Sequence, residues 1–279
     1  MIKRLFFIVL VFINCCCLIA QTTLPYKNKN LPVEVRVKDL LNRMTAQEKF
    51  WQLFMIPGDL DNADTDQYRN GLFGFQVSAG NRGDVGGQML SYNTNESATA
   101  LVKKINAIQK YFVEKTRLGI PITAFDEALH GLVREGATVF PQSIALAATW
   151  DTSLMNNVAN AIAEETMQRG IRQILSPVVN IAADVRWGRT EETYGEDPFL
   201  ASAMGVAFVK AFENKNIITT PKHFIANVGD GGRDSYPIHW NERLLDEVYL
   251  RVVGLIQVSD PQICGDLGRR EKSIQVNQT

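Results

Sequence analysis

Apolar residues along the chain follow two alternating patterns. Helical spacing and helix-end signals predict helices over residues 45–55, 98–119, 151–169, 197–216 and 241–256. Short runs rich in β-branched and aromatic residues predict strands over residues 71–78, 120–125, 172–179 and 217–220. Because helices separate the strands and no Asn-Gly hairpin signal joins neighbouring ones, this order predicts a parallel α/β sheet in one domain, either a barrel or a doubly wound sheet.

Several predicted helices carry recognisable end signals. Thr45 precedes Glu48 by three positions, which is a capping-box pattern, and Asp197 is followed by Pro198, a residue tolerated in the first helical turn. Asp151 is the third expected N-cap, and glycines at 119 and 170 are the expected helix ends. The faces expected to be buried are Leu101, Ile105, Ile108 and Phe112 on one helix and Leu154, Val158 and Ile162 on another.

Residues 1–20 have the layout of a secretory signal peptide. Lys3 and Arg4 precede an apolar run, and Ala20 is a small residue suited to cleavage. The run is short for a membrane span, so no stable span is expected. We therefore expect an exported protein, periplasmic or secreted, whose mature part from residue 21 keeps Cys264 as its one cysteine. A lipid anchor on one of the cysteines 15–17 is the weaker alternative, because no small residue precedes them.

Composition and charge narrow the possible ligands. Of 279 residues, 46% are hydrophobic and 21% are charged, and the formal net charge is −1. This balance provides no long-range field for binding nucleic acid, so specificity has to come from a local site. The three histidines lie far apart in the sequence, so neither a metal site nor a cofactor is predicted.

Ionisable side chains follow three successive predicted strands. The carboxyl ends of parallel strands form the active face of α/β folds, so we predict that these side chains share one polar pocket. The residues concerned are Asp126, Glu127 and His130, then Arg186, Trp187 and Arg189, then Lys222 and His223. Neighbouring residues of a strand point to opposite faces, so Lys222 and His223 can serve one ligand only if the strand ends there.

Structural explanations compete for some of these residues. His130 is better explained as a satisfied core histidine, and Trp187 is expected to pack in the core as well as to stack on a ligand. A group of acidic residues is interpreted as the solvated approach to a capped helix rather than a catalytic set, namely Glu191, Glu192, Glu196 and Asp197.

The remaining side chains suit a sugar. Sugar hydroxyls both donate and accept hydrogen bonds, and the C–H faces of a sugar stack on aromatic rings. The pocket is expected to offer an acid, a guanidinium, an ammonium and an imidazole, from Glu127, Arg189, Lys222 and His223. A phosphate would fit the cations but not the acid.

Three segments resemble one known family. They are LGIPITAFDEALHGLVREGATVFPQSIALAATWD, SPVVNIAADVRWGRTEETYGEDPFL and PKHFIANVGDGGRDS. In order and spacing they are similar to the N-terminal barrel domain of glycoside hydrolase family 3, from about residue 31 to about residue 250. The resemblance implies a (β/α)8 TIM-type barrel, incomplete in this chain. It also implies that the full-length form hydrolyses terminal non-reducing β-linked glucosyl or xylosyl residues by a retaining mechanism, on a β-glycoside or β-linked oligosaccharide.

The resemblance also implies the roles of individual residues. Those matching Glu127, Arg189, Lys222 and His223 line the family's sugar subsite before the scissile bond and hold ring hydroxyls. They are therefore the predicted substrate-binding residues. Glucose-specific members often carry Asp at the position of Glu127 and xylose-specific members often carry Glu, so Glu127 favours a site that tolerates a pentose.

The tail from 251 to 279 departs from the family. Asp260 in the sequence VSD imitates the family's nucleophile motif, but it arrives too early in the chain to be that nucleophile. Neither catalytic carboxyl group is therefore expected here, and the chain expressed alone is expected to be inactive and to aggregate. One alternative is a non-catalytic fragment with at most residual sugar binding. A weaker one is an enzyme that forms a Schiff base through Lys222.

Overall fold

The computed structural model describes residues 24–60, 65–77, 79–80, 91–225, 227 and 239–259. The expectations for the signal peptide, for Asp260 and for the tail beyond it lie outside the described residues. The chain divides into two compact units, with the boundary after Leu53. Each unit is described separately below.

The first unit is helical. Its elements are η1 (Pro25–Lys27), α2 (Val33–Arg43) and α3 (Ala46–Trp51). Helix α3 begins with the predicted capping box, since Glu48 N–H donates to Thr45 Oγ1 (3.2 Å) and Thr45 N–H donates to Glu48 Oε2 (2.8 Å). The sequence pattern did not predict α2. The expected extension of α3 to residue 55 is wrong, because the helix ends at Trp51.

The second unit is built on a five-stranded parallel sheet in the order β1-β2-β5-β6-β7. The predicted parallel α/β sheet is confirmed. The strands are β1 (Met55–Pro57), β2 (Gly74–Gln76), β5 (Thr123–Asp126), β6 (Gln173–Ile174) and β7 (Ile218–Thr219). Strand β1 was missed, because its residues extend an apolar run that also fits the period of the preceding helix.

Two further predictions about extended segments need correction. The strand expected over 172–179 is regular only at β6, and beyond it a single parallel bridge joins Val178 to Lys222. The segment from 79 to 97 is rich in glycine and asparagine, which predicts a loop, but it contains the antiparallel pair β3 (Ala79–Gly80) and β4 (Ser91–Tyr92).

Helices separate the parallel strands as predicted. They are α4 (Ala98–Lys115), α5 (Ser143–Ala147), α6 (Thr152–Gln168), α7 (Pro198–Glu213), α8 (Glu242–Leu244), the π-helix η5 (Leu245–Leu250) and α9 (Arg251–Ser259), with 3-10 turns η2 (Thr65–Tyr68), η3 (Val185–Trp187) and η4 (Thr190–Glu192). Asp151 and Asp197 cap α6 and α7 through their side chains, as expected. Helix α4 ends at Lys115, before Gly119, whose φ of 62° belongs to the turn that leads to β5.

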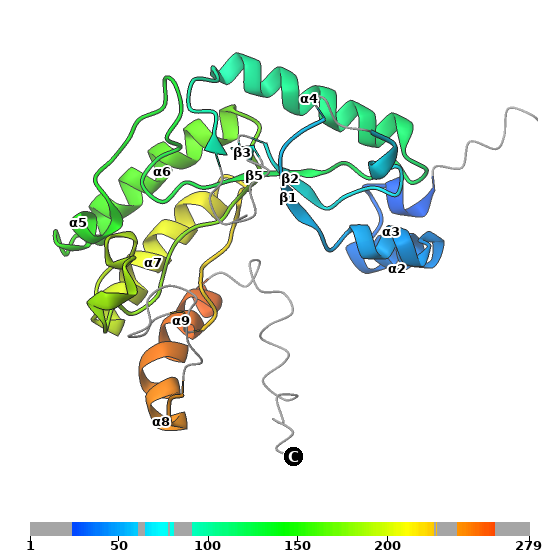
Figure 1. Ribbon diagram of the computed structural model, residues 1–279. Coiled ribbons are helices and arrows are strands. Elements are labelled where there is room, and N and C mark those ends of the chain that lie inside the picture. Colours follow the sequence, from blue (N-terminus) through cyan, green and yellow to red (C-terminus); the bar gives the residue numbers. More distant parts are fainter. Residues whose placement is uncertain are drawn as a thin grey trace, which may run out of the picture. The chain divides into compact units, whose positions relative to one another are not determined.

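The helices bury the faces that pack on the sheet and on one another. The predicted face of α4 is buried, and its Phe112 ring lies 6.1 Å from Phe75 of β2. Helix α6 packs beside α7, and α7 packs against α9 (Figure 1). On α6 the predicted Val158 and Ile162 are buried, but Leu154 is 39% exposed and Met155 is buried instead. None of the helices in the part of the chain that the structure describes is long and apolar enough to cross a membrane.

Candidate functional site

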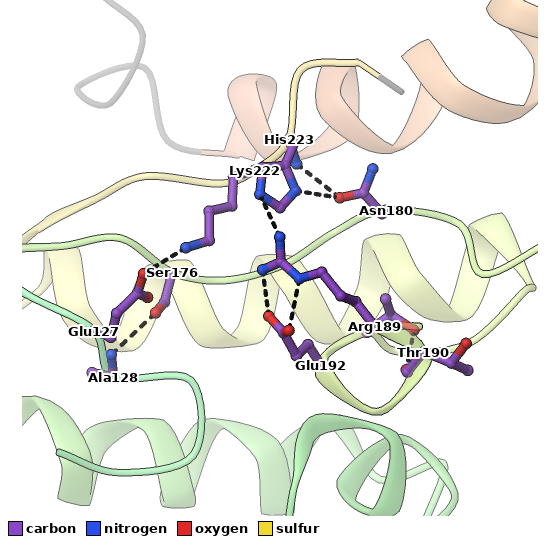
Figure 2. Close-up of polar contacts among 10 residues, drawn as sticks. Glu127, Ala128, Ser176, Asn180, Arg189, Thr190, Glu192, Lys222 and His223 are labelled. Carbon is purple, nitrogen blue, oxygen red and sulfur yellow. Dashed lines mark hydrogen bonds and ion pairs between the residues drawn. The ribbon is translucent and has the colours of Figure 1, made fainter. Parts of the chain in front are cut away.

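The carboxyl ends of β5 and β7 and the segment after β6 bring the predicted polar residues together. Asp126 ends β5 and Glu127 follows it. Lys222 comes shortly after β7 and pairs with Val178 in the bridge described above. Lys222 therefore stands at the end of the β7 segment, where it and His223 reach neighbouring parts of one site (Figure 2).

Glu127 and Lys222 form the first half of the site. Lys222 Nζ lies 2.7 Å from Glu127 Oε1, and the two side chains are 17% and 32% exposed. Among the described residues, the second carboxylate oxygen of Glu127, Oε2, is buried and has no hydrogen-bond partner. Burial raises the pKa of Glu127, Lys222 opposes this rise, and the negative charges of Asp126 and Glu192 add to it.

Arg189 and His223 form the second half of the site. Arg189 Nε and Nη2 donate to the carboxylate oxygens of Glu192 at 2.7 and 2.5 Å, and Arg189 Nη1 lies 3.1 Å from His223 Nε2. Asn180 Oδ1 accepts the His223 main-chain N–H at 2.9 Å and lies 2.8 Å from His223 Nδ1 (Figure 2). Because a guanidinium only donates and an amide oxygen only accepts, Nε2 is the acceptor and Nδ1 carries the proton. This arrangement selects the neutral Nδ1–H tautomer of His223.

Two residues of this network were not identified from the sequence. Glu192 was interpreted as part of a solvated helix approach, whereas it forms the ion pair with Arg189. The side chain of Asn180 is not ionisable, so the search for ionisable residues after strands did not find it. A weak signal for Glu192 was its spacing of three residues from Arg189, which suits an ion pair across one helical turn such as η4.

The remaining predicted residues divide between supporting and exposed positions. Trp187 is 1% exposed, so its ring faces are not open to a sugar. The prediction that Trp187 stacks on a ligand is therefore wrong. His130 has the structural role considered above, since its Nδ1 lies 2.9 Å from Phe140 O. Arg186 pairs with Asp184 on the surface, and Asp197 caps α7.

A second layer of polar contacts lies behind Glu127. Asp126 is fully buried and pairs with Arg134, with Nη2 to Oδ2 at 2.7 Å. Ser176 Oγ accepts the N–H of Ala128 at 3.2 Å (Figure 2). A pocket of about 310 Å³ opens beside Glu127 and is lined mainly by the segment from Leu129 to Arg134.

A larger groove, of about 720 Å³, lies between α6, α7 and α9. Its lining is mainly apolar and small polar residues, with Lys210 as its ionisable group. The groove therefore offers no set of converging polar groups, and the chemistry of this unit belongs to the strand ends.

The charges of the site are balanced within the protein. Lys222 is paired with Glu127, Arg189 with Glu192, and Arg134 with Asp126. An anionic ligand would have to compete with these carboxylates, whereas a neutral polyol would only add hydrogen bonds. Within the described ranges, no three His, Cys, Asp or Glu side chains gather closely enough to hold a metal ion. The arrangement suits hydroxyl binding.

Comparison with known proteins agrees with this fold. Residues 46–253 match the profile of the "Glycosyl hydrolase family 3 N terminal domain". A β-xylosidase of Formosa agariphila is 37% identical over 174 residues, which is 55% of this chain and 23% of that protein. Beta-glucosidase C of Emericella nidulans is 35% identical over 222 residues, 74% of this chain and 35% of that protein. The solved structure of a β-glucosidase from Erythrobacter marinus has a TM-score of 0.71 and 26% identity, covering 85% of this chain and 32% of that one.

The chain belongs to glycosyl hydrolase family 3, since the match to the N-terminal domain of that family covers most of its length. The fold is the TIM-barrel type of that domain, and the described residues supply the five parallel strands above. The family is one of glycosidases that includes β-glucosidases and β-xylosidases. The chain spans about a third or less of the length of these relatives.

Proposed function

We propose that Glu127, Arg189, Lys222 and His223 bind the terminal non-reducing sugar of a β-linked glucoside or xyloside. In this proposal the chain supplies the sugar-binding part of a retaining β-glycosidase. The catalytic nucleophile and the acid/base carboxyl that a retaining mechanism needs are not assigned to any described residue. Glu127 and Glu192 are not assigned to either role, because each is engaged in an ion pair that orients it for binding.

The observation that carries the proposal is the hydrogen bonding of the two carboxylate oxygens of Glu127. One carboxylate oxygen is held by Lys222, and the other is buried with no partner among the described residues. A buried carboxylate oxygen without a hydrogen bond is costly, so this atom is a place for a ligand donor. A sugar hydroxyl can donate to Glu127 and at the same time accept from Lys222, which a phosphate oxygen cannot do.

The ion pair also argues against a Schiff-base enzyme. Formation of a Schiff base needs Lys222 as a neutral amine, which is favoured by an apolar site or a second cation nearby. Lys222 Nζ instead donates to a carboxylate at 2.7 Å, so this nitrogen is engaged in an ion pair rather than open to a carbonyl carbon. Borohydride treatment with a carbonyl substrate is expected to leave the protein unmodified.

The proposal is tested by sugar binding and hydrolysis on the same protein. Binding of glucose and xylose is measured by NMR titration, and hydrolysis is measured with aryl β-glucosides and β-xylosides. Glu127→Gln removes one charged acceptor at constant shape, and the loss of about 1.5–3 kcal/mol corresponds to roughly 10–100-fold weaker binding. Glu191→Gln, on an exposed neighbour, is the matched control and is expected to bind as the unmodified chain does.

The outcomes separate the two interpretations of the chain. Binding that depends on Glu127, without hydrolysis, supports a sugar-binding part and leaves the chain itself as a non-catalytic fragment. Binding of neither sugar, in a folded protein, refutes the proposal. A stronger affinity for xylose than for glucose is expected from the length of the Glu127 side chain, which occupies more space than Asp would.

We also propose that the protein is exported, on the composition of residues 1–20. Mass spectrometry of the protein recovered from the periplasm of a bacterial host is expected to show a chain beginning at Gln21. A chain that keeps Met1 and remains in the cytoplasm contradicts this.

A further inference from the structure

The carboxylate of Asp126 is used entirely inside the protein. Asp126 is the last residue of β5 and is 0% exposed. Its Oδ1 accepts the main-chain N–H of Glu127 at 2.9 Å, and its Oδ2 accepts Arg134 Nη2 at 2.7 Å. Arg134 in turn is only 5% exposed at its side chain and donates Nη1 to the Val133 carbonyl at 2.9 Å. This carboxylate therefore links the sheet, the main chain of Glu127 and the loop that follows.

Both amide groups that flank the Cα atom of Glu127 are held by side chains. Asp126 holds the N–H of Glu127 itself, and Ser176 holds the N–H of Ala128. Ser176 is also fully buried, and the main chain of Asp126 is tied to β6 because Leu175 N–H donates to Asp126 O at 2.9 Å. With both peptide groups fixed to the sheet, the direction in which Glu127 leaves the main chain is fixed as well.

We propose that Asp126, held in place by Arg134, is a positioning residue that aims the Glu127 carboxylate at Lys222 and at the sugar. This inference rests on the proposed function, since it assigns a role to residues behind the proposed sugar-binding carboxylate. Neither Asp126 nor Arg134 has to touch the sugar.

The physical reason is the strength of a charged acceptor. Hydrogen bonds to an ionised carboxylate are shorter and roughly twice as strong as bonds between neutral groups. Asp126 Oδ2 accepts from the Arg134 guanidinium at 2.7 Å, so the carboxylate that accepts from Glu127 N–H is itself held in place.

The first arm of the test needs no sugar. The exchange rate of the Glu127 amide hydrogen is followed by NMR at neutral pH. Exchange is expected to be at least about fivefold faster in Asp126→Asn, where a neutral oxygen replaces the charged acceptor, and within about twofold of the unmodified chain in Arg134→Lys. Lys104→Met breaks another ion pair, 2.7 Å to Glu96, and is expected to leave this exchange rate unchanged. Exchange in Asp126→Asn no faster than in Lys104→Met overturns the proposal.

The second arm measures sugar affinity at neutral pH. Asp126→Asn keeps an oxygen that can accept from Glu127 N–H but removes the charge. The expected loss is about fivefold in the affinity for glucose and xylose, which corresponds to the difference of about 1 kcal/mol between a charged and a neutral acceptor. Arg134→Lys, which keeps the cation, is expected to bind within about twofold of the unmodified chain, a difference below 0.5 kcal/mol.

The two arms keep the inference and the proposed function apart. If the unmodified chain binds neither sugar, the proposed function fails, and the amide exchange still decides whether Asp126 anchors the main chain of Glu127. If the chain binds sugar and Asp126→Asn binds equally well, the positioning role is wrong while the proposed function stands. If Asp126→Asn does not fold, Arg134→Met, which removes the guanidinium that holds Asp126 Oδ2, is measured in the same two arms, and unchanged exchange and affinity in it overturn the proposal.

Discussion

The ion pair between Lys222 and Glu127 gives a stability prediction with a defined pH dependence. Lys222→Met leaves Glu127 as a carboxylate without its cation. Losing one partner of a fully buried ion pair costs about 3–5 kcal/mol of folding free energy, whereas an exposed ion pair contributes about 0–1 kcal/mol. Since the Lys222 and Glu127 side chains are 17% and 32% exposed, we expect a coupling of about 1–2 kcal/mol between these limits.

The sign of the pH dependence follows from the raised pKa of Glu127. Burial favours the protonated form of this carboxyl in the folded state, so its contribution to stability is present at low pH and is lost as pH rises through the folded pKa. Lys222 reduces that loss. Removing Lys222 is therefore expected to destabilise the fold at pH values above the folded pKa of Glu127 and to have little effect at pH values below it.

The assay is a double-mutant cycle with Lys222→Met, Glu127→Gln and the double variant. Unfolding by urea is followed by circular dichroism at about pH 7.5 and about pH 4, below the ordinary pKa of a glutamate. The coupling free energy is expected at neutral pH and is expected to be close to zero at acid pH. The matched control is the pair Lys215–Glu164, at 2.6 Å but with side chains 29% and 41% exposed. A coupling no larger than that of the control, or one unchanged at acid pH, refutes the reasoning.

Two further predictions concern backbone strain and a tautomer. Gly131 has a φ of 124° and a Cβ there would lie 2.3 Å from Thr138 O, whereas Gly58 has a φ of 125° and open space around it. In urea unfolding, Gly131→Ala is therefore expected to lose about 1–3 kcal/mol more folding free energy than the control Gly58→Ala. Equal losses contradict the steric argument. Nitrogen-15 NMR is expected to show the His223 proton on Nδ1, and Asn180→Leu is expected to abolish this preference, because it removes the acceptor of that proton. A proton on Nε2 in the unmodified chain shows that the hydrogen-bond assignment is wrong.

The elements that were predicted correctly have signals within a few residues of one another. The capping residues Thr45, Asp151 and Asp197 act on main-chain groups two or three positions away, so short sequence patterns identify them. The buried face of α4 follows helical periodicity in the same way. Leu154 lies at the edge of the buried face of α6, and periodicity alone does not locate that edge, which depends on the packing of α6 against α7.

The predicted sugar-binding residues do lie together, but their partners depend on long-range contacts. Lys222 and Glu127 are separated by 95 positions, and His223 and Asn180 by 43. The sequence placed Glu127, Arg189, Lys222 and His223 after strands, and parallel pairing then brings strand ends to one edge. Only the packed structure shows that Trp187 is buried and therefore does not stack on a sugar. It is also the packed structure that brings Glu192 and Asn180 into the site.

By itself the sequence determined the α/β class, the parallel pairing of the strands and the N-terminal caps of α3, α6 and α7, and it indicated the four residues proposed to bind sugar. Only the tertiary structure decided that Met55–Pro57 is a strand, that each cation of the site has its own carboxylate, and that Asp126 anchors Glu127 from behind. The physical reason is one of range. Capping and periodicity act within a few residues, whereas strand pairing, burial and ion pairing depend on which distant segments the fold brings into contact.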